Sequence, residues 1–224
     1  WLYIQWFPKE IQDISINDTT YYVIGIADNA FNGNKNIRRV AFDAECDVRY
    51  IGEGAFAGCG NLVEIELPSS IKEIKPYTFA WCEGLKFIEI HNFITKIGER
   101  AFSHCRNLQS IEMSENVEEI GNYAFAWCQQ LTNFTIPKGT KRLGYEILQA
   151  NNNLDTLFFN AINCETSGAY YDGRVERTIG AFEYNKGLTS IIFGEEVEHI
   201  PEYLLYNCYG IDSIDFPKSI REID

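Results

Sequence analysis

The sequence is poor in the residues on which nucleic-acid binding, membrane insertion and much enzyme chemistry depend. It has three histidines and one methionine among 224 residues, and 19 Lys and Arg residues against 32 Asp and Glu residues. A net charge of −13 repels phosphate backbones and anionic lipid surfaces, because proteins bind both through Lys and Arg. The chain contains no run of about 18 apolar residues, which is the length that crosses a membrane as a helix. We therefore expect no nucleic-acid partner and no direct insertion into a membrane.

Sequence motifs that carry chemistry are missing as well. The chain contains no H-E-x-x-H, C-x-x-C, Walker loop or G-x-S-x-G. Its one adjacent pair of histidine and cysteine is His104 and Cys105. We interpret this pair as structural, because Cys105 belongs to an inward-facing column of the repeat described below, whereas a nucleophilic thiolate must be exposed and activated. The sequence thus predicts no catalytic site, no cofactor and no bound metal, and we expect that the protein is not an enzyme.

What the sequence does contain is a repeat of 23 residues. A phenylalanine or leucine that follows a small or apolar residue returns at intervals of 25, 23, 23, 23, 23, 34 and 23 residues. These positions are Phe31, Phe56, Phe79, Phe102, Phe125, Leu148, Phe182 and Leu205. They define eight coils, with two extra residues in the first interval and eleven in the sixth.

The other positions of the repeat fall into columns, and the complete unit reads I-x-x-x-A-F-x-x-C/N-x-x-L-x-x-I-x-L-P. In the I-x-L segment the two apolar residues are two apart, so they share one face of a strand. Proline ends several of these segments because it cannot donate to the next ladder bond. One coil cannot bury its apolar face alone, so only a stack of coils has a core. The sequence predicts an α/β-type but mostly β repeat: a right-handed solenoid with one parallel strand per coil.

These motifs resemble the BspA-like, Treponema pallidum-type class of leucine-rich repeats. The resemblance covers roughly residues 23–224 and includes the A-F-x-x-C segment at 55–59 and the L-x-x-I-x-L-P segment at 62–68. The more widespread leucine-rich class has Asn or Cys three residues after its last leucine, where this chain has Ser70. The resemblance implies a protein that bacteria export or display at the cell surface. It also implies a binding or adhesion role, towards host matrix proteins or the surfaces of other microbes.

The two ends and one interval depart from the repeat. Residues 1–26 contain two apolar segments around Asn17-Asp18-Thr19-Thr20, a pattern that predicts a hairpin capping the first coil. Residues 27–224 are predicted to form the solenoid. The eleven extra residues fall near 163–178, where Gly and Asp flank Tyr170 and Tyr171, so we expect a projecting loop or small hairpin.

The first and last residues suggest a trimmed chain. It opens at Trp1 without an initiator methionine, which predicts a processed or trimmed product. It stops at Asp224 in the middle of a repeat, so we expect that the natural chain continues, the alternative being a natural end with a brief cap.

Five of the seven cysteines occupy the Cys/Asn column and two lie outside it. Equivalent residues of stacked coils lie about 4.8 Å apart, so neighbouring column thiols have parallel side chains that cannot form a disulfide. The off-column residues Cys46 and Cys164 are separated by five coils, which is too far for a bridge unless the insert folds back. We expect seven reduced, metal-free thiols, with metal ligation by the stacked column as the alternative.

The outward position of the I-x-L segment is the candidate binding surface. Along the coils it reads Ala41, Glu66, Glu89, Glu112, Thr135, Phe158, Ile192 and Asp215. Stacked glutamates repel one another, a cost that a purely structural face would avoid. The predicted partner-binding residues are Glu66, Phe87, Glu89, Glu112, Phe158, Ile192, Tyr170 and Tyr171. The alternative is a solvated sheet face with a few apolar residues. A second outward column, Trp81, His104 and Trp127, either binds a partner or only stacks on itself.

From these observations we expect a non-enzymatic recognition or adhesion module, extracellular or at the cell surface, that binds a protein ligand through its outward strand face. The alternative is a structural spacer or assembly segment of a larger surface protein. If the strand face binds, aromatic and aliphatic residues should anchor the partner, while the glutamates should set the association rate.

Overall fold

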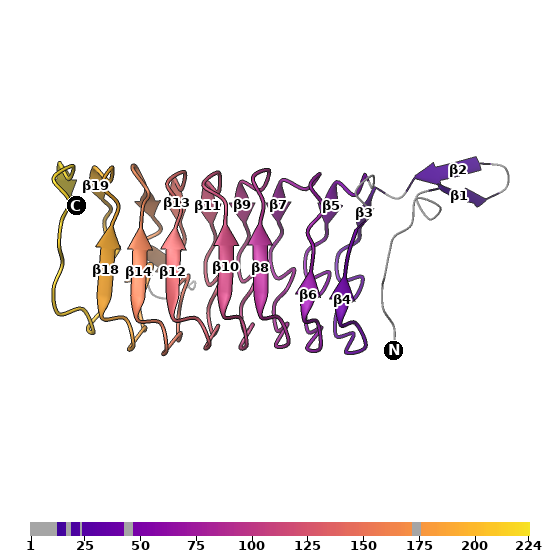
Figure 1. Ribbon diagram of the computed structural model, residues 1–224, viewed down its shortest axis with the longest axis horizontal. Helices are drawn as coiled ribbons and strands as arrows, with labels where there is room; N and C mark the ends of the chain where they lie inside the picture. The colour runs from indigo at the N-terminus through magenta and orange to yellow at the C-terminus, as the bar shows by residue number, and fades with distance from the viewer. Residues whose placement is uncertain (1–12, 17–18, 23, 43–46, 172–175) are drawn as a thin grey trace.

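The computed structural model describes residues 13–16, 19–22, 24–42, 47–171 and 176–224, with the backbone alone for 13–16, 19–22, 169–171 and 176–177. The coils are stacked along one long axis, with the strands of each coil roughly perpendicular to it (Figure 1). Every regular element within the described ranges is a strand, and none of these residues belongs to a helix able to cross a membrane.

The first set of strands comes from the I-x-L segments and forms what we call the front face. These strands are β4 (Arg39–Val40), β6 (Glu64–Ile65), β8 (Phe87–Ile90), β10 (Ser110–Met113), β12 (Asn133–Ile136), β14 (Thr156–Phe159) and β18 (Ser190–Phe193). They pair in parallel in three groups, β4–β6, β8–β10 and β12–β14–β18. The predicted solenoid with parallel strands is confirmed, and in the eighth coil the corresponding segment pairs through a single parallel bridge between Ile192 and Asp215.

The opposite side of the stack carries a second set of strands, each two residues long, which the sequence analysis did not predict. This back face consists of β3 (Gly25–Ile26), β5 (Tyr50–Ile51), β7 (Glu73–Ile74), β9 (Lys96–Ile97), β11 (Glu119–Ile120), β13 (Arg142–Leu143), β15 (Glu165–Thr166), β19 (His199–Ile200) and β20 (Glu222–Ile223). Five of these strands form one continuous parallel sheet in the order β7, β9, β11, β13 and β15. Two residues are too few to show the alternation by which a strand is recognised in a sequence.

The core between the two faces is a ladder of phenylalanine rings. Phe56, Phe79, Phe102 and Phe125 are fully buried, and successive rings are stacked with centroids 5.7, 5.3 and 5.2 Å apart. Phe31 begins the ladder at 5.2 Å from Phe56. The small residue before each of these phenylalanines is buried beside the ladder in coils two to five. This packing explains why the Ala-Phe pair marks each coil in the sequence.

The Cys/Asn column has a shared hydrogen-bonding role that was not apparent from the sequence. The thiols of Cys82, Cys105 and Cys128 each donate, at 3.2 Å, to the carbonyl oxygen of the phenylalanine one coil earlier. Asn151 takes the same role in the sixth coil, with its Nδ2 2.9 Å from the oxygen of Phe125. Either Cys or Asn can occupy this column, because the side chain of each can donate a hydrogen bond to a carbonyl oxygen that is buried between coils.

We expect all seven thiols to be reduced and the column thiols to react slowly in the folded protein. The six described cysteines are free, and Cys46 lies outside the described residues. Burial raises the pKa of Cys59 to about 11 and the pKa of Cys208 to about 12, so little thiolate forms at pH 8. Thiol titration of the unfolded protein should find seven groups, and native alkylation at pH 8 should be slow. Fewer than seven groups would contradict this expectation.

Two antiparallel hairpins accompany the stack. Strands β1 (Asp13–Ile16) and β2 (Thr19–Tyr22) pair near the N-terminus, and β16 (Ala169–Tyr171) pairs with β17 (Glu176–Thr178) in the sixth interval. Because β15 pairs with β13 in the back face, residues 165–166 belong to the stack, and the hairpin follows them. The capping role expected for residues 1–26 stays a prediction.

Candidate recognition surface on the front face

The front face is built by strict alternation along each I-x-L strand. In β8, Ile88 and Ile90 are buried, whereas Phe87 and Glu89 are exposed. The same alternation recurs in β12, where Phe134 and Ile136 are buried. The outward residues of successive strands therefore form stripes that run along the solenoid.

A groove of about 710 Å³ opens on this face between the second and third coils. Strands β6 and β8 border this groove. They are not paired with each other, so the front sheet is interrupted at this point. Its lining combines carboxylates, two phenylalanines, a lysine and a histidine: Glu64, Glu66, Glu89, Phe87, Phe93, Lys86 and His91. Three predicted site residues, Glu66, Phe87 and Glu89, thus meet in one groove.

The two phenylalanines at the groove are unusually exposed for their type. Phe87 is 43% exposed and Phe93 is 64% exposed. The ring of His91 lies edge-on to Phe93, with centroids 5.9 Å apart. The Nδ1 of His91 accepts the backbone N–H of Phe93 at 3.3 Å, so its Nε2 must carry the proton that it shares with the carbonyl of Pro68 at 3.0 Å. The imidazole of His91 thus joins two coils and holds Phe93 in place.

The sequence analysis missed Phe93 and His91 because both lie outside the I-x-L segment. One signal could have found them. The positions equivalent to Phe93 in neighbouring coils are Ser70, Asn116 and Gly139, so a phenylalanine interrupts a column of small or polar residues.

The carboxylates of the front face are only partly neutralised. Arg39 forms ion pairs with Glu64 at 3.1 Å and with Glu66 at 2.9 Å. Glu89 and Glu112 are direct neighbours in the pairing of β8 with β10, both are exposed, and neither forms an ion pair within the described part of the chain. Two like charges therefore face each other without a counter-ion.

The equivalent outward stripe of the back face is arranged differently. Its residues alternate in charge along β7, β9, β11, β13 and β15: Glu73, Lys96, Glu119, Arg142 and Glu165. Lys96 Nζ lies 3.1 Å from Glu119 Oε2, and Arg142 contacts the same carboxylate. Cross-strand pairs of opposite charge stabilise a sheet, and like pairs destabilise it. The back face thus neutralises itself, and the front face does not.

This difference predicts opposite effects of charge removal on stability. The double change Glu89→Gln and Glu112→Gln should raise the free energy of unfolding by about 0.2–1 kcal/mol, because it removes a cross-strand repulsion. The change Glu119→Gln should lower it by a similar amount, because two cations lose their partner. Urea denaturation at low salt measures both effects, and added salt should shrink them. A less stable double variant would show that the front-face glutamates have a structural role.

The remaining predicted site residues lie apart from the groove. Phe158 and Ile192 are register partners in β14 and β18, where Ile192 is 47% exposed and Phe158 is half-buried. Thr135 separates them from Glu112, and β10 is not paired with β12. Tyr170 and Tyr171 belong to β16, and their side chains lie outside the described residues. The predicted surface therefore consists of an acidic groove and a separate apolar patch.

Two more outward columns flank the phenylalanines of the ladder, one two residues after each phenylalanine and the other two residues before it. Trp81, His104 and Trp127 are stacked, with centroids 5.1 and 5.5 Å apart. Beside them, the guanidinium of Arg100 lies 5.8 Å from the ring centroid of Tyr77 and 4.5 Å from that of Tyr123.

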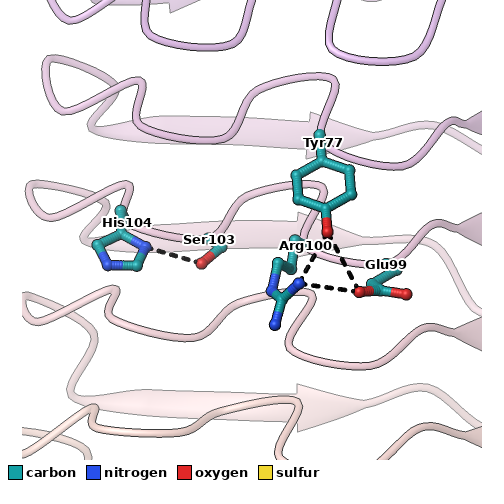
Figure 2. A network of polar contacts seen from close by, with 5 residues as sticks. All are labelled: Tyr77, Glu99, Arg100, Ser103 and His104. Carbon is teal, nitrogen blue, oxygen red and sulfur yellow. Dashed lines mark hydrogen bonds and ion pairs between the residues drawn. The ribbon is translucent and has the colours of Figure 1, made fainter.

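Polar contacts of Arg100 and His104 fix these columns (Figure 2). Arg100 Nη1 donates to Tyr77 Oη at 2.7 Å and to Glu99 at 3.1 Å. A hydrogen bond of 2.9 Å joins His104 Nδ1 and Ser103 Oγ, and burial lowers the pKa of His104.

The His104–Cys105 pair does not form a catalytic arrangement in this geometry. The thiol of Cys105 is fully buried and donates to the carbonyl of Phe79, whereas His104 is stacked between two indoles on the outside of the turn. Burial holds the pKa of Cys105 well above its ordinary value. The thiol therefore has neither the exposure nor the thiolate character of a nucleophile.

One group of possible metal ligands occurs among the described residues. His199, Glu222 and Asp224 have ligand atoms within 4.8 Å of one another. The Nε2 of His199 lies 2.7 Å from Oδ2 of Asp224, so these two groups already satisfy each other. We regard the group as a hydrogen-bonded pair with a neighbouring carboxylate rather than as a metal centre.

Comparisons with known proteins agree with this architecture. Chains of three bacterial proteins of solved structure have the same fold. The T. pallidum leucine-rich-repeat protein is 26% identical, with 89% of this chain and 75% of that chain covered and a TM-score of 0.62. The pneumococcal vaccine antigen PcpA is 18% identical, and the match covers 94% of this chain and 60% of that chain with a TM-score of 0.61. A leucine-rich cell surface protein from Faecalibacterium prausnitzii is 19% identical, with 95% and 76% covered and a TM-score of 0.50.

A search of curated proteins finds no match. The family model for the BspA type leucine rich repeat region, in contrast, matches in six copies over residues 24–155 and 175–224. This match covers most of the sequence. It agrees with the phenylalanine ladder and the parallel strands of the structure. The chain therefore belongs to the BspA-type leucine-rich-repeat family.

Proposed function

We propose that this protein is a non-enzymatic recognition module that binds a basic segment of a partner protein in the groove between β6 and β8. The observation that carries this proposal is the charge contrast between the faces. Among the described residues, Glu89 and its register partner Glu112 on β10 face each other without a counter-ion. Of the two, Glu89 lines the groove together with the exposed rings of Phe87 and Phe93. A sheet face that serves only stability would alternate its charges, as the back face does. Lys or Arg side chains of a partner would neutralise the front carboxylates.

The exposed rings suit the same kind of partner. Aromatic side chains supply most of the affinity of many interfaces, and their flat faces also attract cations. A segment that combines Lys or Arg with large apolar residues would occupy both the carboxylates and the rings. The patch of Phe158 and Ile192 lies further along the same face, and we propose that it contacts a second part of the partner.

We further propose that the partner is a protein of the host matrix or of another microbe's surface, and that this module acts outside the bacterial cell. Two of the similar structures support this location, because they are described as a cell surface protein and a vaccine antigen. The alternative is a role as a structural spacer in a larger assembly.

Selection of peptides from a random display library tests the binding role without a known partner. The wild-type protein serves as bait. A front variant with Phe87→Ala and Glu89→Gln serves for counter-selection. We expect enriched peptides to combine Lys or Arg with aromatic or aliphatic residues, and to bind the front variant poorly. A back variant with Glu73→Gln and Glu165→Gln is the control for loss of charge away from the groove and should bind as the wild type does. Enrichment of acidic peptides, or no enrichment at all, would favour the spacer role.

A further inference from the structure

The groove between β6 and β8 carries more negative than positive charge. Its lining contains the carboxylates of Glu64, Glu66 and Glu89, against the single ammonium group of Lys86. Lys86 forms no ion pair among the described residues. Arg39, from the coil before, contacts Glu64 and Glu66 through one oxygen of each, Oε1. The groove therefore attracts a further cation.

The contacts of Arg39 show how this face holds a cation. Its Nη2 lies 3.1 Å from Oε1 of Glu64 and 2.9 Å from Oε1 of Glu66, so one guanidinium bridges two carboxylates. Lys96 and Lys141, in contrast, each form an ion pair with a single carboxylate. A guanidinium presents several N–H donors in a fixed plane, whereas an ammonium is a compact and strongly hydrated charge.

Arg100 shows how the protein holds the flat side of a guanidinium. The group lies 4.5 Å from the ring centroid of Tyr123 and 5.8 Å from that of Tyr77. Its Nη1 also donates to the carboxylate of Glu99 at 3.1 Å (Figure 2). An aromatic ring and a carboxylate thus bind one arginine together in this chain.

The groove offers both kinds of contact at once. Glu66 and Glu89 occupy equivalent positions of β6 and β8, 23 residues apart, and both line the groove. Phe87 is an exposed ring on the same outward face of β8 as Glu89. A pair of carboxylates and an exposed ring therefore border one space, which is the combination that the chain uses for its own arginines.

We propose that the groove selects arginine over lysine in the basic segment that it binds, with the guanidinium between Glu66 and Glu89 and its flat side against Phe87. This inference rests on the proposed function and adds to it the side chain that is recognised. A lysine in the same place would contact one carboxylate and would gain less from the ring, because its ammonium keeps its water. Lys86 repels both cations alike, so it does not alter the preference.

Three peptides that differ in one residue type test the selection. They have the sequence acetyl-Gly-Leu-X-Leu-X-Gly-amide, where X is arginine, lysine or citrulline, which has nearly the shape of arginine without its charge. Titration into the isotope-labelled protein at low salt, followed by NMR, gives each dissociation constant and shows which backbone amides shift. We expect the arginine peptide to bind roughly fivefold or more tightly than the lysine peptide, with shifts in β6 and β8, and the citrulline peptide to bind more weakly than either.

A variant without the ring separates selection from simple attraction of charge. Phe87→Leu keeps an apolar side chain at an exposed position and removes the aromatic face. It should weaken the arginine peptide and leave the lysine peptide nearly unchanged, so that the two affinities converge. Phe158→Leu is the matched control, because it removes a ring from the separate patch on the same face. It should retain the wild-type ratio of affinities.

The outcomes distinguish this inference from the proposed function. If the lysine peptide binds at β6 and β8 as tightly as the arginine peptide, or if the ratio survives Phe87→Leu, the selection of arginine is wrong and the basic groove stands. If neither charged peptide binds, or if the citrulline peptide binds equally well, both the selection and the proposed groove for a basic segment are wrong.

Discussion

Phe102→Ala is expected to lower the free energy of unfolding by about 3–5 kcal/mol, a large share of the stability of a domain of this size. The ring of Phe102 is fully buried and is stacked on Phe79 at 5.3 Å and on Phe125 at 5.2 Å. Backbone hydrogen bonds of 2.8 Å, from Phe79 to Ala101 and from Phe102 to Ala124, hold the coils on both sides in place. The surrounding structure cannot collapse into the space, so the cavity remains and adds to the lost burial.

Phe31→Ala is the matched control for this change. Phe31 is half-buried and has one stacked neighbour among the described residues, Phe56 at 5.2 Å. Because each coil contacts only its neighbours, the same deletion near the end of the stack should cost clearly less. Chemical denaturation followed by circular dichroism measures both losses. Equal losses would contradict a stack held together by contacts between adjacent coils.

The columns were predictable because burial repeats with the coil. A residue such as Phe79 or Leu85 has the same surroundings as its counterpart 23 residues away, so one apolar period marks the whole core. Because the repeat is so regular, the interruption of the front face between β6 and β8 could not be predicted from the sequence. The second and third coils carry the same L-x-x-I-x-L spacing, and nothing in that pattern shows that β6 and β8 do not pair.

Hydrogen-bond roles were less accessible than burial. A buried cysteine gives the same sequence signal whether or not its thiol donates, so the bond from Cys105 to Phe79 could be found only from the structure.

The candidate site was predictable in its charge but not in its geometry. The outward stripe of glutamates follows from strand alternation. The ion pair that neutralises Glu66 could not be predicted from this alternation, because its partner Arg39 belongs to the previous coil and to the adjacent stripe. Phe93 was missed because it lies outside the I-x-L segment, and its contact with His91 depends on where the chain turns after β8.

Phe87→Ala is expected to weaken the binding of a basic peptide in the groove by roughly 30-fold, or about 2 kcal/mol, mainly through faster dissociation. Phe87 is the exposed ring on the strand itself, next to Glu89 and across the groove from Glu66.

Phe158→Ala should have a comparable effect only if the ligand is long enough to reach the second patch. Glu89→Gln with Glu112→Gln should instead slow association at low salt, because these carboxylates attract the ligand before contact.

The most direct test of a recognition surface on the front face is a biosensor comparison of matched charge changes. A peptide from the display selection is immobilised, and the wild type, the Glu89→Gln and Glu112→Gln variant, and the Glu73→Gln and Glu165→Gln variant are passed over it at low salt. All three must first show the same folded state by circular dichroism. We predict slower association for the Glu89→Gln and Glu112→Gln variant and wild-type kinetics for the Glu73→Gln and Glu165→Gln variant, although both lose two negative charges. Equal slowing by both variants would mean that only net charge attracts the peptide, and would contradict a recognition surface on the front face.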